Sequence, residues 1–208
     1  MKITMKQIVL ATTNQGKQQE FARLLQGLDI EVLSLKEFPE IGEIIENGET
    51  FEENALIKAR TVANYTGLCA LADDSGLIVD YLDGAPGIYS ARFAGEERCD
   101  EKNNQKLLAL LENVPKEKRT AKFCCAIAIV SPHDEEQVVT GYCQGMITNE
   151  PIGHGGFGYD PLFWVPQYHK TFAQLSIDEK NAISHRGMAN RQAVLQLRQM
   201  VEGVTGCE

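Results

Sequence analysis

Two neighbouring carboxylates, Asp73 and Asp74, directly follow the apolar segment Leu68–Ala72. We expect this segment to be a strand that ends at the two acids, and α/β sheets bind their ligands at the carboxyl ends of strands. Carboxylate oxygens suit Mg²⁺, and one carboxylate can hold the ion while it takes a proton from water. The acidic segment upstream carries Glu46 and Glu49, which can supply a further ligand. The alternative is a turn in which one aspartate caps backbone groups.

A polar turn separates a strand pattern, Gln7–Ala11, from a helical pattern, Gln18–Gln26; it consists of Thr12, Thr13, Asn14, Gln15, Gly16 and Lys17. A helix N-terminus presents N–H groups and partial positive charge to an anion, and Lys17 adds a full charge. The turn is not a Walker A loop, because Ala11 replaces the first glycine and Gln18 the hydroxyl residue. It indicates either a phosphate site or an ordinary turn with a solvated lysine.

Glycines surround an aromatic ring and an acid in a later segment, which contains Phe157, Gly158, Tyr159 and Asp160. An aromatic ring can stack on a nucleobase while a carboxylate accepts hydrogen bonds from the N–H groups of the base. Aromatic runs are otherwise typical of the core, and we expect the following residues, Leu162–Trp164, to be buried there. The segment therefore predicts a base-binding loop beside core residues.

Two cations, Lys180 and Arg186, stand six residues apart, after a capping box at Ser176–Glu179. Residues at this spacing do not share one face of a straight helix. We expect the helix that begins at the box to be interrupted or kinked near Ser184–Gly187, with a last helix from Met188 onward. Only with such a bend can both cations serve one site.

The elements that must position these residues alternate between strand and helix in the first half of the chain. A second strand is expected at Ile30–Leu35, and a capping box at Thr50 starts a helix that ends at Gly67. Ala121–Val130 is apolar on both faces, so it should lie centrally in a sheet, and Val138–Thr148 should return from it as a hairpin. The pattern predicts an α/β fold, a mixed central β-sheet flanked by helices, in a single domain over residues 1–208.

Composition excludes several classes of function. The 208 residues carry a net charge of −9, from 20 Lys and Arg against 29 Asp and Glu, so duplex DNA or RNA would be repelled. A small anion chelated by a metal is still allowed. No apolar run is long enough to span a membrane, and Met1–Leu10 lacks the pattern of a signal peptide, so we expect a cytoplasmic protein. The six cysteines and four histidines show no zinc-site spacing, and we expect reduced thiols.

Taken together, these residues resemble the inosine triphosphate pyrophosphatase family over nearly the whole chain. The likeness rests on five blocks in order, each in a segment discussed above or adjacent to one: residues 12–17, 46–55, 72–77, 157–161 and 184–187. The resemblance implies a homodimeric cytoplasmic enzyme with two lobes around a substrate cleft. It would use Mg²⁺ to hydrolyse ITP, dITP and XTP to the monophosphate and pyrophosphate.

The resemblance also assigns roles by position. At the phosphate end, the triphosphate is held by Thr12, Thr13, Asn14, Gln15, Gly16 and Lys17, Mg²⁺ by Glu46 and Asp74, and Asp74 is also the general base. Ser75 lies at the substrate. The nucleoside end is lined by Phe157, Gly158, Tyr159, Asp160 and Lys180, with His185 and Arg186 at the base. The opening block has Thr13 where many members have glycine, which concerns the backbone path of the loop.

Three other functions remain open on the sequence. The related Maf-type nucleotide pyrophosphatases share the strand, loop and lysine opening but not the blocks at Phe157–Asp160 and Ser184–Arg186 as they stand here. A nucleotide-binding regulatory module would bind without hydrolysis. A plain scaffold protein would need all five blocks to be packing features.

Overall fold

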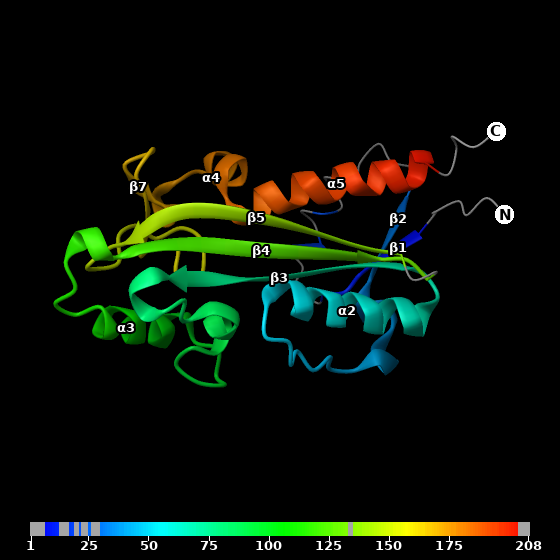
Figure 1. The fold of residues 1–208 in the computed structure, drawn as a ribbon, viewed down its shortest axis with the longest axis horizontal. Coiled ribbons are helices and arrows are strands. Elements are labelled where there is room, and N and C mark those ends of the chain that lie inside the picture. The colour runs from blue at the N-terminus through cyan, green and yellow to red at the C-terminus, as the bar shows by residue number, and fades with distance from the viewer. Residues whose placement is uncertain are drawn as a thin grey trace. The chain divides into compact units, whose positions relative to one another are not determined.

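The computed structural model describes residues 7–12, 17–18, 21, 25, 30–132 and 135–203. Within these residues a single sheet has the strand order β2-β1-β3-β4-β5-β6-β7 (Figure 1). The strands are β1 (Gln7–Leu10), β2 (Glu31–Ser34), β3 (Cys69–Val79), β4 (Thr120–Val130), β5 (Glu136–Ile147), β6 (Phe163–Val165) and β7 (Lys170–Thr171). The helices are α2 (Phe51–Thr66), α3 (Asp100–Leu110), α4 (Ile177–Ile183) and α5 (His185–Gly203). The predicted α/β fold with a central sheet is confirmed.

The sheet is mixed, as expected. β1 pairs in parallel with both β2 and β3, whereas β6 pairs antiparallel with β5 and with β7. β4 occupies the middle of the strand order and is buried along most of its length, as a strand apolar on both faces should be. β5 lies next to β4 and runs in the opposite direction in Figure 1, as the predicted hairpin requires.

The strand that carries the two aspartates does not end at them, so this expectation was wrong. β3 continues through Asp73 and Asp74 as far as Val79. The strand that ends is its neighbour: β1 pairs with β3 only from Ile8–Leu10 against Cys69–Leu71. The polar break in the apolar run marks the loss of a neighbouring strand and not a turn. The acids still lie just beyond the carboxyl end of a parallel strand, but that strand is β1.

Contacts along the chain divide it into two compact units. Unit 1 comprises Met1–Asp74, Ala126–Thr140 and Ala189–Glu208, and unit 2 comprises Ser75–Cys125 and Gly141–Met188. In unit 1, α2 and α5 lie on opposite faces of the sheet; in unit 2, α3 and α4 do so (Figure 1). Each unit therefore covers both faces of its part of the sheet with helices.

Local signals set the helix boundaries. The Thr50 hydroxyl accepts a hydrogen bond from Glu53 N at 3.1 Å, and Gly67 ends α2 with φ 65°, which favours glycine. α3 ends at Leu110, whose side chain is 47% exposed. Leu107, one turn earlier in the same helix, is fully buried and faces the core.

No helix in the described part of the chain has the length and hydropathy that crossing a membrane requires.

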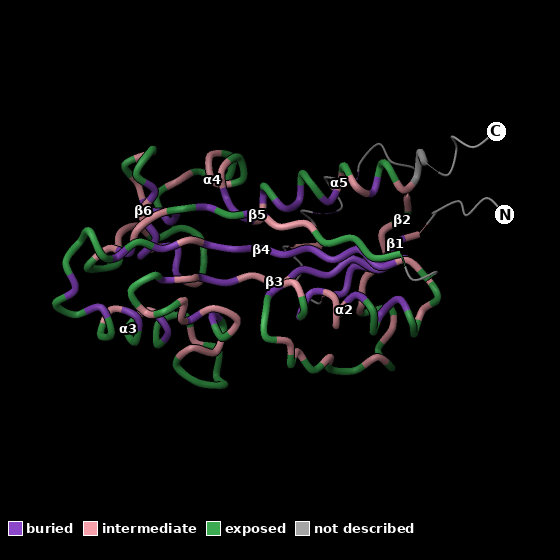
Figure 2. Tube along the Cα trace, viewed as in Figure 1, coloured by how far each residue is buried: buried purple, intermediate pink, exposed green. Residues whose placement is uncertain are grey.

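Aromatic packing builds the core of unit 2. The ring centroid of Phe163 lies 4.6 Å from that of Phe123 and 4.8 Å from that of Phe172. Leu162 and Phe163 are fully buried, as expected, whereas Trp164 is only partly buried. Burial is concentrated along β3 and β4 (Figure 2). Asp73, Asp74 and Ser75, which are described below, lie on one of these strands, β3.

Buried cysteines give a test of this core. Burial raises the pKa of the Cys69 thiol to about 12 and that of the Cys143 thiol to about 11. Since the thiolate is the reactive form, both side chains should react slowly with iodoacetamide at about pH 8, far more slowly than the partly exposed Cys99. Mass spectrometry of each site over time measures this, with a denatured sample as the control. Equal rates at Cys69 and Cys99 in the folded protein would contradict the buried environment.

Candidate active site

The turn after β1 brings a lysine onto β3. Lys17 Nζ lies 2.7 Å from Asp73 Oδ2, and the Asp73 side chain is only 3% exposed. A carboxylate removed from water to this degree requires a cation or donors, so Asp73 holds Lys17 in place. Upstream, Thr12 O accepts a hydrogen bond from Gln18 Nε2 at 2.8 Å. The other residues of the predicted phosphate turn lie outside the described residues: Thr13, Asn14, Gln15 and Gly16.

The two predicted metal ligands converge on one ammonium group. Lys58 Nζ, on α2, lies 2.6 Å from Glu46 Oε2 and 3.7 Å from Asp74 Oδ1. Oxygens that surround one cation can surround another, so this pair fits a hard divalent ion such as Mg²⁺. Within the described ranges, no set of three or more His, Cys, Asp or Glu side chains gathers as a metal cluster. The described residues thus offer two carboxylates to such an ion.

Lys58 is a site residue that the sequence analysis missed. It stands three residues after Ala55 and four before Val62, both of which are fully buried. This spacing places it on the apolar face of α2, where a charged side chain is rare unless it has a partner. A lysine on an otherwise apolar helical face was the signal that could have identified it.

The neighbouring aspartates have different partners because successive side chains of a strand point to opposite faces. Asp73 pairs with Lys17, whereas Asp74 faces Lys58. Of the two aspartates, Asp74 is therefore the one that shares a cation with Glu46, the other predicted metal ligand. Asp73 instead pairs with the lysine of the predicted phosphate turn.

The predicted helix interruption is confirmed in unit 2. α4 ends at Ile183, Ser184 takes the extended conformation (φ −67°, ψ 153°), and α5 begins at His185, three residues earlier than expected. Gly187 permits the tight junction, because a Cβ there would lie 2.0 Å from the carbonyl oxygen of Asn181. The junction thus depends on a residue without a side chain.

The bend brings both predicted cations to one aromatic ring. Lys180 Nζ lies 4.8 Å, and Arg186 Cζ 5.5 Å, from the ring centroid of Phe157. Lys180 also pairs with Asp160 Oδ2 at 2.5 Å, and Arg186 Nη2 donates to the Ser75 hydroxyl at 3.2 Å. Phe157 is 60% exposed although it is a large apolar residue. The cluster thus combines an exposed aromatic ring with two cationic hydrogen-bond donors over that ring, a combination that suits a nucleobase.

Asp160 holds the aromatic loop from inside. Its side chain is 4% exposed, and Oδ2 accepts a hydrogen bond from Phe157 N at 2.9 Å in addition to its ion pair with Lys180. Gly158 continues the loop with φ 59°. Asp160 therefore fixes both the backbone of Phe157 and one of the two cations beside its ring.

Two other predicted substrate residues, Tyr159 and His185, are buried. The Tyr159 hydroxyl donates to Ser90 O at 2.8 Å, and desolvation by burial, followed by the charge of Asp100, raises its pKa. The His185 ring stacks on Phe123, with 4.6 Å between the centroids and 10° between the planes. Both side chains support the loop and the helix junction in this structure. Their contact with a ligand stays a prediction.

One known protein family matches a range of this sequence that contains every predicted site residue. The model of the Ham1 family matches residues 8–196. The chain belongs to the Ham1 family. The resemblance to inosine triphosphate pyrophosphatases is confirmed, because curated Ham1 relatives of this chain are named dITP/XTP pyrophosphatase.

Individual relatives extend the Ham1 match over most of the chain. The dITP/XTP pyrophosphatase of Desulforamulus reducens is 54% identical over 187 residues, which cover 90% of this chain and 93% of the relative. That of Geobacter sulfurreducens is 55% identical over 185 residues, 89% of this chain and 93% of the relative. The Ham1 protein structure from Staphylococcus aureus has a TM-score of 0.88 at 42% identity, and that from Coxiella burnetii 0.89 at 45%; each comparison covers 94% of this chain and 100% of the other.

The helix junction can be tested by adding one methyl group. Gly187→Ala places a Cβ against the Asn181 carbonyl, so the α4–α5 bend must open. We expect a loss of about 1–3 kcal/mol in the free energy of unfolding and a Tm lower by about 5 °C, measured by thermal denaturation. Met188→Ala, at the exposed next position, is the control and should leave Tm nearly unchanged. Equal Tm values for Gly187→Ala and the wild type would show that the bend does not need this glycine.

Proposed function

We propose that this chain is a nucleoside triphosphate diphosphatase that hydrolyses ITP, dITP and XTP to the monophosphate and pyrophosphate. The observation that carries the proposal is the convergence of Glu46 Oε2 and Asp74 Oδ1 on one cation, Lys58 Nζ, at 2.6 and 3.7 Å. The substrate class is supported by relatives named dITP/XTP pyrophosphatase that are 54% and 55% identical to this chain. The exposed Phe157 ring in unit 2 supplies a surface for the base.

Glu46 and Asp74 are the residues that would hold Mg²⁺. Mg²⁺ in nucleotide enzymes uses one or two carboxylates and takes its remaining ligands from phosphate and water, so two acids suffice. When bound, the ion would neutralise charge that develops on the phosphoryl oxygens. The ion pairs of both acids with Lys58 support this proposal, because a cation already lies between their oxygens.

The triphosphate is held in this proposal by the predicted turn Thr12–Lys17 and its lysine. Lys17 is oriented by the buried Asp73 carboxylate, so the cost of fixing a flexible lysine is met within the fold. A positioned cation stabilises the phosphate in the ground state, and it stabilises the larger negative charge of the transition state more strongly. Lys58 adds a second positive charge in the same unit.

The proposed reaction is attack by water on the α-phosphorus. Asp74 accepts the water proton as the new bond between oxygen and phosphorus forms. The bond from the α-phosphorus to the bridging oxygen then breaks, and pyrophosphate leaves with the electron pair. Negative charge grows on the leaving group, so cations placed before the reaction, such as Lys17, lower the barrier.

The base would stack on Phe157 beside Lys180 and Arg186. Hypoxanthine and xanthine carry an oxygen acceptor at position 6, which the cationic donors can satisfy, whereas adenine carries an amino donor there. A donor facing a donor leaves both unpaired, and buried mismatches of this type discriminate by up to about 10⁴–10⁵. The chemistry of this edge therefore favours 6-oxo purines over ATP.

The resemblance also supports proposals about location, assembly and partners. We propose that the chain acts in the cytoplasm as a homodimer. Its ligand would be a small nucleotide and not a nucleic acid, which agrees with the net charge of −9. Light scattering coupled to size exclusion measures the oligomeric state. A mass of 23.1 kDa throughout would show a monomer.

Asp74→Asn tests the role of the general base. The amide cannot accept the water proton, so kcat for ITP should fall by about 10²–10⁴-fold. Pyrophosphate release under saturating ITP and Mg²⁺ is the measurement. The control is Asp83→Asn, at an exposed position with φ 50° that asparagine also tolerates, and it should retain full activity. If Asp74→Asn keeps a third or more of the wild-type turnover, Asp74 is not the base.

Substrate choice tests the base surface. We expect kcat/KM for ITP to exceed that for ATP by at least about 10²-fold, because only the 6-oxo edge satisfies the donors. Pyrophosphate release is measured with ITP, XTP, GTP, ATP, dTTP and UTP, with and without Mg²⁺. A ratio of ITP to ATP near one would refute the proposed recognition, and a preference for dTTP or UTP would point to a Maf-type activity. Binding of ITP without pyrophosphate release would indicate a regulatory module.

A further inference from the structure

The exposed Phe157 ring has little packed protein behind its loop. A hollow of about 390 Å³ lies between the loop and α3 in unit 2. Its lining includes Asp100, Glu101, Asn104, His154, Gly156 and Phe157. Because hydrophobic packing does not fill this space, other contacts must fix the position of the loop relative to α3.

Two side chains of α3 hold the loop across this hollow. Asp100 Oδ2 accepts a hydrogen bond from Gly158 N at 2.7 Å, and Asn104 Nδ2 donates to Gly158 O at 2.9 Å. Both backbone polar groups of the residue that follows Phe157 are thus bound by one helix. Asp100 and Asn104 stand four residues apart, so they lie on the same face of α3, one turn from each other.

Both side chains bind the loop while polar groups close to them on α3 have no side-chain partner. Asp100 is in the first turn of α3, where an acid favours the helix terminus, yet the helix has no side-chain cap at Cys99. Asn104 Oδ1 is buried and has no hydrogen-bond partner among the described residues. A buried acceptor left in this way costs free energy. The amide is therefore oriented by its bond to Gly158 and by no other contact at its oxygen.

We propose that Asp100 and Asn104 are positioning residues for purine recognition: they hold Gly158 so that the Phe157 ring stays at the height where Lys180 and Arg186 flank it. This inference rests on the proposed function, in which Phe157 stacks on the base. An exposed ring on a loose loop would lose freedom each time a base bound, whereas a loop held in advance avoids that cost. The two side chains therefore act on binding of the base and not on the phosphates.

Steady-state kinetics with two single variants test the proposal. Asn104→Leu removes the donor to Gly158 O, and Asp100→Ala removes the acceptor from Gly158 N. Each variant should raise KM for ITP about tenfold, because it should lose part of the binding energy that stacking of one base supplies. The value of kcat should change less than threefold. The Ki of inorganic triphosphate as a competitor should not change, because it has no base. A general loss of structure would instead raise KM and Ki together.

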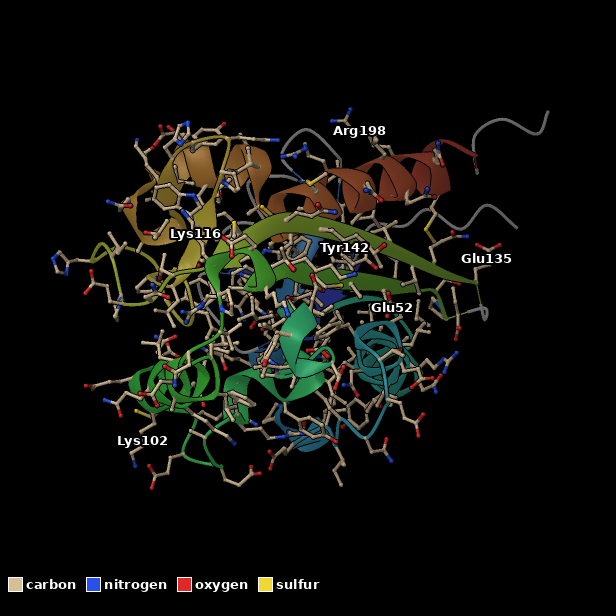
Figure 3. All side chains as sticks on the ribbon, turned by 60° about the vertical axis from the view of Figure 1, so that its left-hand side comes forward. Glu52, Lys102, Lys116, Glu135, Tyr142 and Arg198 are labelled. Atoms are coloured by element: carbon tan, nitrogen blue, oxygen red, sulfur yellow. The ribbon has the colours of Figure 1, made fainter. Side chains whose placement is uncertain are left out.

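Four further variants make the outcome decisive. Asp100→Asn keeps an acceptor for Gly158 N and should restore KM to near the wild-type value. Lys102→Ala, on the outer side of the same helix (Figure 3) and 58% exposed in its side chain, is the matched control. In the double variant Asn104→Leu with Phe157→Ala, KM for ITP should be no higher than in Phe157→Ala alone, because both changes act through one ring.

The results separate this inference from the proposed function. Wild-type protein that does not prefer ITP to ATP would overturn the proposed function itself. Wild-type preference for ITP together with unchanged KM in both Asn104→Leu and Asp100→Ala would overturn only the positioning role. Additive losses in the double variant, or equal increases in KM and Ki, would also overturn it. If one single variant does not fold, as judged by its Tm, the other carries the test.

Discussion

A carboxylate that leaves water must be met by a cation or by N–H donors, and this constraint organises both polar clusters of the protein. In unit 1 the buried Asp73 carboxylate holds Lys17 at 2.7 Å. In unit 2 the buried Asp160 carboxylate holds Lys180 at 2.5 Å and also the backbone of Phe157. Each ion pair fixes a long, flexible cation where a ligand would otherwise have to order it. The folded chain thus orders these cations in advance of any ligand.

The long strand β3 gives residues that are neighbours in the chain different partners. Side chains alternate along the strand, so Asp73 serves Lys17 while Asp74 serves the pair with Glu46. Because β1 stops while β3 continues, polar side chains occupy strand positions that have lost a neighbour on one side. A strand gives these acids a more rigid base than a turn would, and rigid placement is what the proposed metal pair and the proposed proton acceptor require.

In unit 2 the same need for rigid placement is met by a break between two helices and by clamps on a loop. The extended Ser184 turns the chain so that cations from α4 and α5 reach one ring. The ring itself is exposed, so core packing does not fix it. Hydrogen bonds to Phe157 N and to both backbone groups of Gly158 do so instead. An aromatic surface can then remain open to a ligand without being mobile.

The sequence by itself determined what depends on near neighbours: the capped starts of α2 and α4, the glycine end of α2, the central place of β4 and the break before α5. These follow from backbone capping and from hydrophobic periodicity. Only the tertiary structure decided which distant partners meet, such as Lys17 with Asp73, Lys58 with Glu46 and Asp74, and α3 with Gly158. Such pairs arise from sheet register and helix packing, and no local pattern encodes a contact between residues 56 or 58 positions apart.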